Sequence, residues 1–202
     1  MGTIHACRVY YSCRDTICNK VVGCLQGVGD RKEALRAVKS YLEHLECTSC
    51  FRTYSADELQ GTCPACGKVL YARYDLESAR GSFRPESLVG RPANLWRYFE
   101  VLPVRDEASV ITLGEGFTPI LKTERLGREM GCSNVYIKDE GINPTASFKA
   151  RGMSTAVSKA GELGLTRLTV PSAGNAAGAM AAYAAKGGME GYVFVPKDAP
   201  NA

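Results

Sequence analysis

The chain has 202 residues, of which 45% are hydrophobic and 23% charged, and its formal net charge is +4. These values are ordinary for a globular chain of one or two domains. A small net charge without a basic run does not predict binding to nucleic acid or a membrane, and no apolar stretch is long enough to span a bilayer. The N-terminus carries Arg8, Arg14, Asp15 and Lys20 and forms no signal-peptide core, so we expect a cytoplasmic protein.

Residues 1–46 read as an N-terminal extension with one amphipathic helix. The helix is predicted from Asp30, which forms a capping pair with Glu33, and it places one apolar face at Leu35, Val38, Leu42 and Leu45. The extension also contains Cys7, Cys13, Cys18 and Cys24, whose spacing matches neither a zinc finger nor an iron–sulfur motif. We interpret these four as incidental thiols.

Residues 47–75 contain two Cys-x₂-Cys pairs separated by 12 residues, made by Cys47, Cys50, Cys63 and Cys66. Four thiolates in two such turns form the closed tetrahedral site of structural zinc. The alternating pattern at 69–74 favours short strands, so this segment is predicted to be a zinc ribbon. Two unrelated pairs or a redox pair are the alternatives, and His44 is a competing ligand that we place instead on the preceding helix.

The rest of the chain, residues 76–202, alternates between helix and strand patterns. We read 75–94 as a connector and 94–102 as a short helix whose Leu95, Trp96 and Phe99 pack in a core. Helices are predicted at 123–130, 147–163 and 176–185, and strands at 135–138, 168–170 and 192–195. This alternation indicates an α/β fold with a parallel sheet.

A lysine motif occupies residues 143–152, Asn-Pro-Thr-Ala-Ser-Phe-Lys-Ala-Arg-Gly. It places Lys149 in the first turn of a predicted helix, after Ser147 as the capping residue. The positive end of a helix dipole disfavours the cationic form of a lysine, and covalent catalysis needs a neutral amine. A surface lysine near a helix cap is the alternative, and Arg151 is open to either a phosphate or an ion pair on the helix surface.

A second motif, Pro-Ser-Ala-Gly-Asn-Ala-Ala-Gly at 171–178, lies between a predicted strand and a predicted helix. A tight turn that leads into a helix N-terminus is an arrangement that binds anions. At the carboxyl end of a strand in an α/β sheet it also lies where ligands bind. A plain strand-to-helix turn would use the same Gly and Asn residues.

Together the two motifs resemble the fold-type-II pyridoxal-phosphate (PLP) enzymes and, within them, the threonine synthase family. A third match is Thr-Leu-Gly-Glu-Gly-Phe-Thr-Pro at 112–119, followed by Val-Tyr-Ile-Lys-Asp-Glu-Gly at 135–141. The resemblance covers residues 44–202, and zinc ribbons occur in some members. Two departures are Ala146, where glycine is common, and Ala150, where many members have aspartate.

The resemblance implies a PLP enzyme with an open parallel sheet that converts O-phosphohomoserine and water to threonine and phosphate. Lys149 would bind the cofactor covalently and then act as acid and base, and Asn175 would hydrogen-bond the cofactor's 3′ oxygen. Phe148 would pack near the cofactor or in the core. The substrate carboxylate would bind the loop formed by Ser172, Ala173, Gly174, Asn175 and Ala176.

In this family the loop for the cofactor phosphate and the partner of the pyridine nitrogen both lie downstream of residue 202. We therefore expect residues 76–202 to be the N-terminal part of a catalytic domain that is inactive alone, and a homodimer at full length. Cysteate synthase, threonine dehydratase and other fold-type-II enzymes stay open as alternatives. So does a non-catalytic fragment whose ribbon binds a partner.

Overall fold

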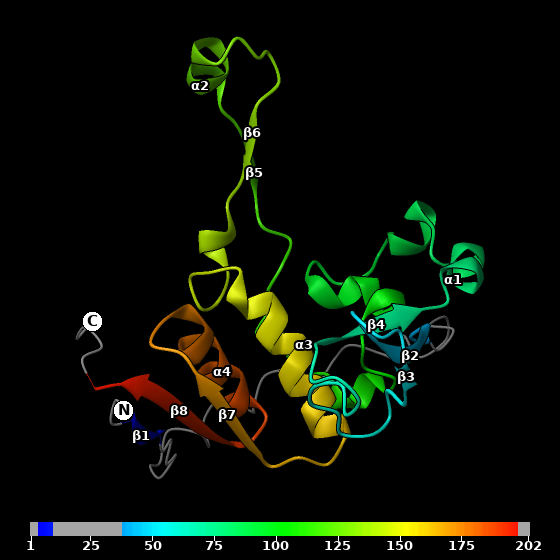
Figure 1. Cartoon of the computed structure of the whole chain (residues 1–202). Coiled ribbons are helices and arrows are strands. Elements are labelled where there is room, and N and C mark those ends of the chain that lie inside the picture. Colours follow the sequence, from blue (N-terminus) through cyan, green and yellow to red (C-terminus); the bar gives the residue numbers. More distant parts are fainter. Residues whose placement is uncertain (1–3, 10–37, 198–202) are drawn as a thin grey trace, which may run out of the picture.

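The computed structural model describes residues 4–9 and 38–197, which contain three small sheets and the helices around them (Figure 1). Residues 10–37 lie outside the described residues. They include most of the helix predicted from Asp30, and also Cys13, Cys18 and Cys24. Among the described residues, no helix is long and apolar enough to cross a membrane.

The cysteine-rich segment is built on a three-stranded antiparallel sheet. Strand β2 (Leu42–Cys47) lies between β3 (Thr53–Tyr54) and β4 (Leu70–Tyr74). The sequence prediction of a helix through Leu42 and Leu45 is therefore wrong, and His44 lies on a strand. Pairing with two neighbouring strands satisfies the backbone of β2, and this tertiary pairing overrides a short helical spacing.

Residues 75–110 form short helices around a small apolar core. Helix α1 (Leu76–Ser82) is capped by the Asp75 side chain, so the predicted connector is partly helical. It is followed by the 3₁₀ helices η1 (Pro85–Leu88), η2 (Leu95–Val101) and η3 (Glu107–Ser109). Trp96, Phe99 and Val104 are buried together, which confirms the predicted packing of the 94–102 helix.

Residues 119–138 form an arm that projects from the body of the molecule (Figure 1). Strands β5 (Ile120–Lys122) and β6 (Tyr136–Lys138) pair antiparallel, and α2 (Glu124–Glu129) caps the tip. The arm returns to the body at the 3₁₀ helix η4 (Glu140–Ile142). The helix and strand predicted here are confirmed, but the strand belongs to a hairpin because it pairs with β5.

The C-terminal part is an α/β unit made of α3 (Lys149–Glu162), β7 (Arg167–Pro171), α4 (Asn175–Lys186) and β8 (Glu190–Pro196). Strands β7 and β8 are parallel, as predicted. Strand β1 (Ile4–Val9) adds an antiparallel edge to β8, which the sequence analysis missed. Helix α4 packs on the β7–β8 pair and α3 packs on α4. The α/β class is confirmed, although the sheets combine parallel and antiparallel pairs.

Candidate active site and metal centre

The two residues that the sequence analysis placed on the cofactor each begin a helix. Lys149 is the first residue of α3 and Asn175 the first residue of α4. The two helices pack together, with Ala150, Val157 and Tyr183 buried in one apolar cluster. The loop before α3 and the loop from β7 into α4 lie at the same end of this helix pair (Figure 1). The fold therefore brings the two sequence motifs together.

The lysine side chain lies against its neighbour in sequence. Lys149 is half-buried, and its Nζ is 4.5 Å from the centroid of the Phe148 ring. Phe148 is 58% exposed, so within this chain it is not a core residue. The residue that caps α3 is Phe148, one position after the predicted Ser147. The Ser147 hydroxyl instead accepts a hydrogen bond from the Lys149 N–H at 3.3 Å.

The turn before Lys149 is fixed by the side chain of Asn143, which is buried. Its amide nitrogen donates to Glu140 at 2.8 and 2.9 Å, and its amide oxygen accepts from the Gly116 N–H at 3.0 Å. Ala146 has φ 53°, a left-handed conformation that favours glycine. In the same turn the Thr145 hydroxyl oxygen is buried and has no hydrogen-bond partner among the described residues.

An ion pair joins the arm's base to the lysine helix. Arg151 donates from Nε and Nη2 to the two oxygens of Glu140 at 2.6 and 2.7 Å. Arg151, together with the hydroxyl of Thr118, lowers the pKa of Glu140 to about 2. The sequence analysis left Arg151 either a phosphate contact or an ion pair, and the structure shows the ion pair. Lys138, which the sequence analysis left without a role, donates to the Thr118 carbonyl.

The loop that was predicted to bind the substrate carboxylate is open at the N-terminus of α4. Its Ser172 N–H donates to the carbonyl of Phe194 at 3.1 Å, which holds the loop on β8. The Gly174 N–H donates to the Ser172 hydroxyl at 3.3 Å. Ala173, Gly174 and Asn175 are exposed, while Ser172 and Ala176 are half-buried. The first N–H groups of a helix have no acceptor within the helix, so this end suits an anion.

Sequence analysis missed the role of Glu115, which it used only as part of the 112–119 motif. Glu115 is fully buried. It lies between its own loop, residues 111–116, and the helices η2, α3 and α4. Its neighbour Gly116 has φ 94°, and a Cβ there would lie 2.8 Å from the Leu95 nitrogen. The sequence does contain a sign of this role. Glu115 stands between two glycines, with Leu113 and Phe117 on either side, and this pattern could have predicted a buried carboxylate.

The four predicted cysteine ligands converge at one point. The sulfur atoms of Cys47, Cys50, Cys63 and Cys66 all lie within 4.8 Å of one another. The Cys47–Cys66 and Cys50–Cys63 sulfur distances are 3.4 and 3.6 Å, too long for disulfide bonds. In a tetrahedral zinc site with Zn–S bonds of ordinary length, the sulfurs are about 3.8 Å apart.

Hydrogen bonds favour the thiolate forms of Cys47 and Cys63, whereas the pKa of the Cys66 thiol is raised to about 12, despite a backbone hydrogen bond from Lys68, by the neighbouring sulfurs and by burial. The Tyr54 hydroxyl lies 3.1 Å from the Cys63 sulfur, and it lowers the pKa of that thiol to about 6. The N–H groups of Cys50 and Ser49 point at the Cys47 sulfur and lower its pKa. The thiolate is the form that binds metal, so this donor set fits a zinc ion. His44 lies beside Glu43 and Glu46 and is not part of the cluster.

The lysine site also fits the group that the sequence motifs imply. A primary amine at a helix start, an exposed amide at the neighbouring helix start and a row of N–H groups lie at one end of α3 and α4. A buried hydroxyl without a partner at Thr145 offers a further polar contact to a bound molecule. These groups suit a cofactor that is bound by an amine and that carries polar ring substituents.

Comparison with known proteins shows which families the chain resembles. The profile of the family described as "Pyridoxal-phosphate dependent enzyme" matches residues 111–202. The chain is 41% identical to threonine synthase of Methanocaldococcus jannaschii over 151 residues, which is 75% of this chain and 37% of that protein. It is 40% identical to threonine synthase of Methanosarcina acetivorans over 153 residues, 76% of this chain and 37% of that protein. Threonine synthase of Halalkalibacterium halodurans is 47% identical over 103 residues, 51% of this chain and 29% of that protein.

Residues 111–202 therefore match the family of PLP-dependent enzymes. Three-quarters of the chain is similar to part of these threonine synthases. It spans about 37% of the length of the archaeal relatives.

Proposed function

We propose that the longer protein to which this chain corresponds converts O-phosphohomoserine and water to threonine and phosphate. The observation that carries the proposal is the placement of Lys149 and Asn175 at the adjoining starts of α3 and α4. The 40% identity to threonine synthases across three-quarters of the chain supports the choice of reaction. A cytoplasmic location and a homodimer stay predictions for the longer protein.

Each residue of the site has a defined task in this reaction. When bound, PLP supplies an electron sink for carbanions next to the substrate nitrogen. Lys149 would hold the cofactor through its amine, and the same amine would take and return protons at the substrate carbons. Asn175 would orient the cofactor ring through its side-chain amide, and Phe148 would pack nearby. The loop from Ser172 to Ala176 binds the substrate carboxylate with backbone N–H groups at the positive end of α4.

The test of this function uses the longer protein. Reduction with borohydride in the presence of PLP should attach the cofactor to Lys149, as located by peptide mapping. The Lys149→Ala variant should take up no label and should keep its thermal unfolding temperature. Label on any other lysine would refute the assignment of Lys149.

Substrate choice is tested with phosphate release. O-phosphohomoserine should release phosphate and yield threonine, while O-phosphoserine and threonine should react far more slowly. Turnover of O-phosphoserine with sulfite, without turnover of O-phosphohomoserine, would assign cysteate synthase instead. Asn175→Ala should keep the cofactor on Lys149 but lower kcat by on the order of 10²-fold.

We also infer that Cys47, Cys50, Cys63 and Cys66 bind one structural zinc ion. The sulfur distances and the hydrogen bonds that favour thiolates support this inference. Elemental analysis of protein purified without a chelator should give about one zinc per chain, and Cys50→Ser should lower that content. Cys132, which is exposed at the tip of the arm, is the control: Cys132→Ser should leave the zinc content unchanged.

A further inference from the structure

Glu115 is a buried carboxylate that forms no salt bridge within the described part of the chain, although the charge of Arg151 lies near enough to interact with it. It is 0% exposed, and none of the ion pairs found in the described ranges involves it. Its oxygens accept hydrogen bonds from the Tyr183 hydroxyl at 2.5 Å and from Trp96 Nε1 at 3.1 Å. The Leu113 N–H at 3.0 Å and the Thr112 hydroxyl at 3.1 Å complete the set.

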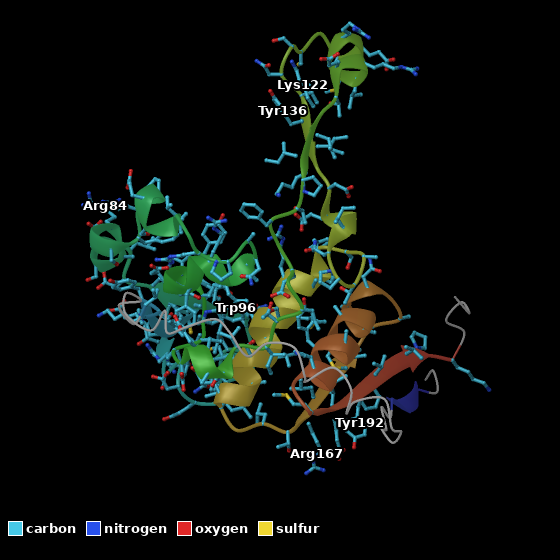
Figure 2. The ribbon with its side chains drawn as sticks, turned by 180° about the vertical axis from the view of Figure 1, so that it is seen from behind. Arg84, Trp96, Lys122, Tyr136, Arg167 and Tyr192 are labelled. Carbon is cyan, nitrogen blue, oxygen red and sulfur yellow. The ribbon has the colours of Figure 1, made fainter. Side chains whose placement is uncertain are left out.

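The contacts of Glu115 reach both helices of the candidate active site, α4 directly through Tyr183 and α3 through Trp96. Tyr183 lies on α4, eight positions after Asn175. Trp96 Nε1 also contacts the Ser154 hydroxyl at 2.9 Å, and Ser154 lies on α3, five positions after Lys149. Figure 2 shows Trp96 pointing inward between the short helices around η2 and α3. Glu115 therefore lies where α3, α4 and η2 meet.

The loop that carries Glu115 is also hydrogen-bonded to α3, through both backbone groups of Ile111. The Ser154 hydroxyl donates to the carbonyl of Ile111 at 2.9 Å, and the Ile111 N–H donates to the Ser158 hydroxyl at 2.7 Å. Ser154 and Ser158 are both fully buried. The 111–116 loop is thus fixed to α3 on one side and, through Glu115, to α4 on the other.

A buried carboxylate has a physical consequence that an apolar residue lacks. Burying a charge is costly, and apolar side chains of similar volume often give equal or greater stability. A carboxylate does, however, require its donors at defined positions, because each unsatisfied donor or acceptor is costly. Glu115 accepts a hydrogen bond from α4 and is linked to α3 through Trp96 and through its own loop, so it fixes how the two helices sit against each other.

We propose that Glu115 is a positioning residue for the cofactor site, which sets α3 against α4 and so places Lys149 relative to Asn175. The proposal rests on the proposed function for the roles of Lys149 and Asn175, but the helix clamp itself does not. Its first test therefore needs no cofactor and uses the chain described here.

The first test is amide hydrogen exchange, followed by mass spectrometry on peptides from α3 and α4. Glu115→Gln should raise exchange in both helices by on the order of ten-fold, because a neutral amide replaces a charged acceptor. Glu46→Gln is the matched control, since Glu46 also accepts a tyrosine hydroxyl, that of Tyr71, at 2.7 Å. It should raise exchange only in the β2–β4 sheet. Unchanged exchange in α3 and α4 of Glu115→Gln would overturn the proposal.

Tyr183→Phe is the milder variant if Glu115→Gln does not fold, because it removes one hydroxyl and keeps the ring in the core. Its matched control is Tyr71→Phe. In Tyr183→Phe, exchange should rise in α4 and, to a smaller extent, in α3. Equal exchange in Tyr183→Phe and the wild-type chain would count against the clamp.

The second test separates positioning from stability alone, with the longer protein and bound PLP. Tyr183→Phe should lower kcat by on the order of ten-fold with a smaller change in KM, and should shift the pH at which the bound cofactor's absorbance changes. Tyr71→Phe should alter neither. If Tyr183→Phe exchanges faster but keeps the wild-type kcat and absorbance, Glu115 contributes to stability only. That result would overturn the proposal. Failure of the proposed function is seen separately, as a wild-type protein whose Lys149 takes no label on reduction.

Discussion

At the scale of single residues, Ala146 is the clearest departure from what the backbone favours. It adopts φ 53° in the turn before Lys149, a left-handed conformation that favours glycine. The turn is held by the Ala146 N–H, which donates to the Asn143 carbonyl at 2.7 Å. The alanine therefore retains a conformation that its Cβ disfavours.

We predict that Ala146→Gly stabilises the chain. Relief of a left-handed non-glycine residue contributes about 1–2 kcal/mol, while the greater freedom of unfolded glycine opposes it by about 0.4–1 kcal/mol. The net gain should be about 0.5–1 kcal/mol in the free energy of unfolding, measured by urea titration. Ala150→Gly, inside α3, is the control and should destabilise by about 1 kcal/mol. A destabilised Ala146→Gly variant would contradict the reading of this turn.

Glu140 gives a pH-dependent prediction, because Arg151 holds its pKa at about 2, below the ordinary value of 4.5. A lowered pKa adds stability that is present above the ordinary value and is lost as pH falls towards 2. Glu140→Gln should therefore be less stable than the wild type at pH 6, and the difference should shrink between pH 5 and about 2. Urea titrations of both proteins at each pH measure it, and the wild-type curve accounts for acid effects elsewhere. A difference independent of pH would argue against the ion pair.

At the scale of elements, the cysteine cluster depends on the short strands around it. Strand β2 ends at Cys47, and β3 ends at Tyr54, whose hydroxyl contacts the Cys63 sulfur. Groups that hydrogen-bond to a ligand commonly change metal affinity by about 10–100-fold when removed. Sheet and metal site therefore stabilise each other.

We predict that Tyr54→Phe lowers zinc affinity by roughly ten-fold, because the lost hydrogen bond raises the pKa of the Cys63 thiol. Competition with a chromophoric chelator measures the affinity. Tyr71→Phe, in the same sheet but bonded to Glu46, should bind zinc as the wild type does. Equal affinities for Tyr54→Phe and Tyr71→Phe would show that the Tyr54 contact does not matter for the metal.

At the scale of the whole molecule, the arm projects from the body and exposes several apolar side chains. Its apolar side chains are exposed in both strands, with Ile120 at 64% and Tyr136 at 54%. A hairpin of two strands is marginally stable alone, and unpaired apolar edges promote association between chains. Lys122 and Tyr136 lie along this arm in Figure 2, away from the body.

We predict that the chain associates through the arm as concentration rises. Ile137, which is 48% exposed on β6, is the residue to change. Ile137→Lys should shift the protein towards monomer in sedimentation experiments, since a charged strand disfavours edge pairing. Val89→Lys, which alters a still more exposed apolar residue (83%) outside the arm, should leave the association unchanged. Association that persists in Ile137→Lys would place the contact elsewhere.

The sequence by itself determined the α/β alternation, the two helices that begin near Lys149 and Asn175, and the four converging cysteines. These features depend on local patterns, namely helical and strand periodicity, turn residues and ligand spacing, and each is encoded within a short stretch. Only the tertiary structure decided that residues 42–47 form a strand, that β1 joins β8 and that Arg151 pairs with Glu140. It also decided that Glu115 is buried, because its hydrogen-bond partners Trp96 and Tyr183 are far away in sequence and meet only when α3, α4 and η2 pack together.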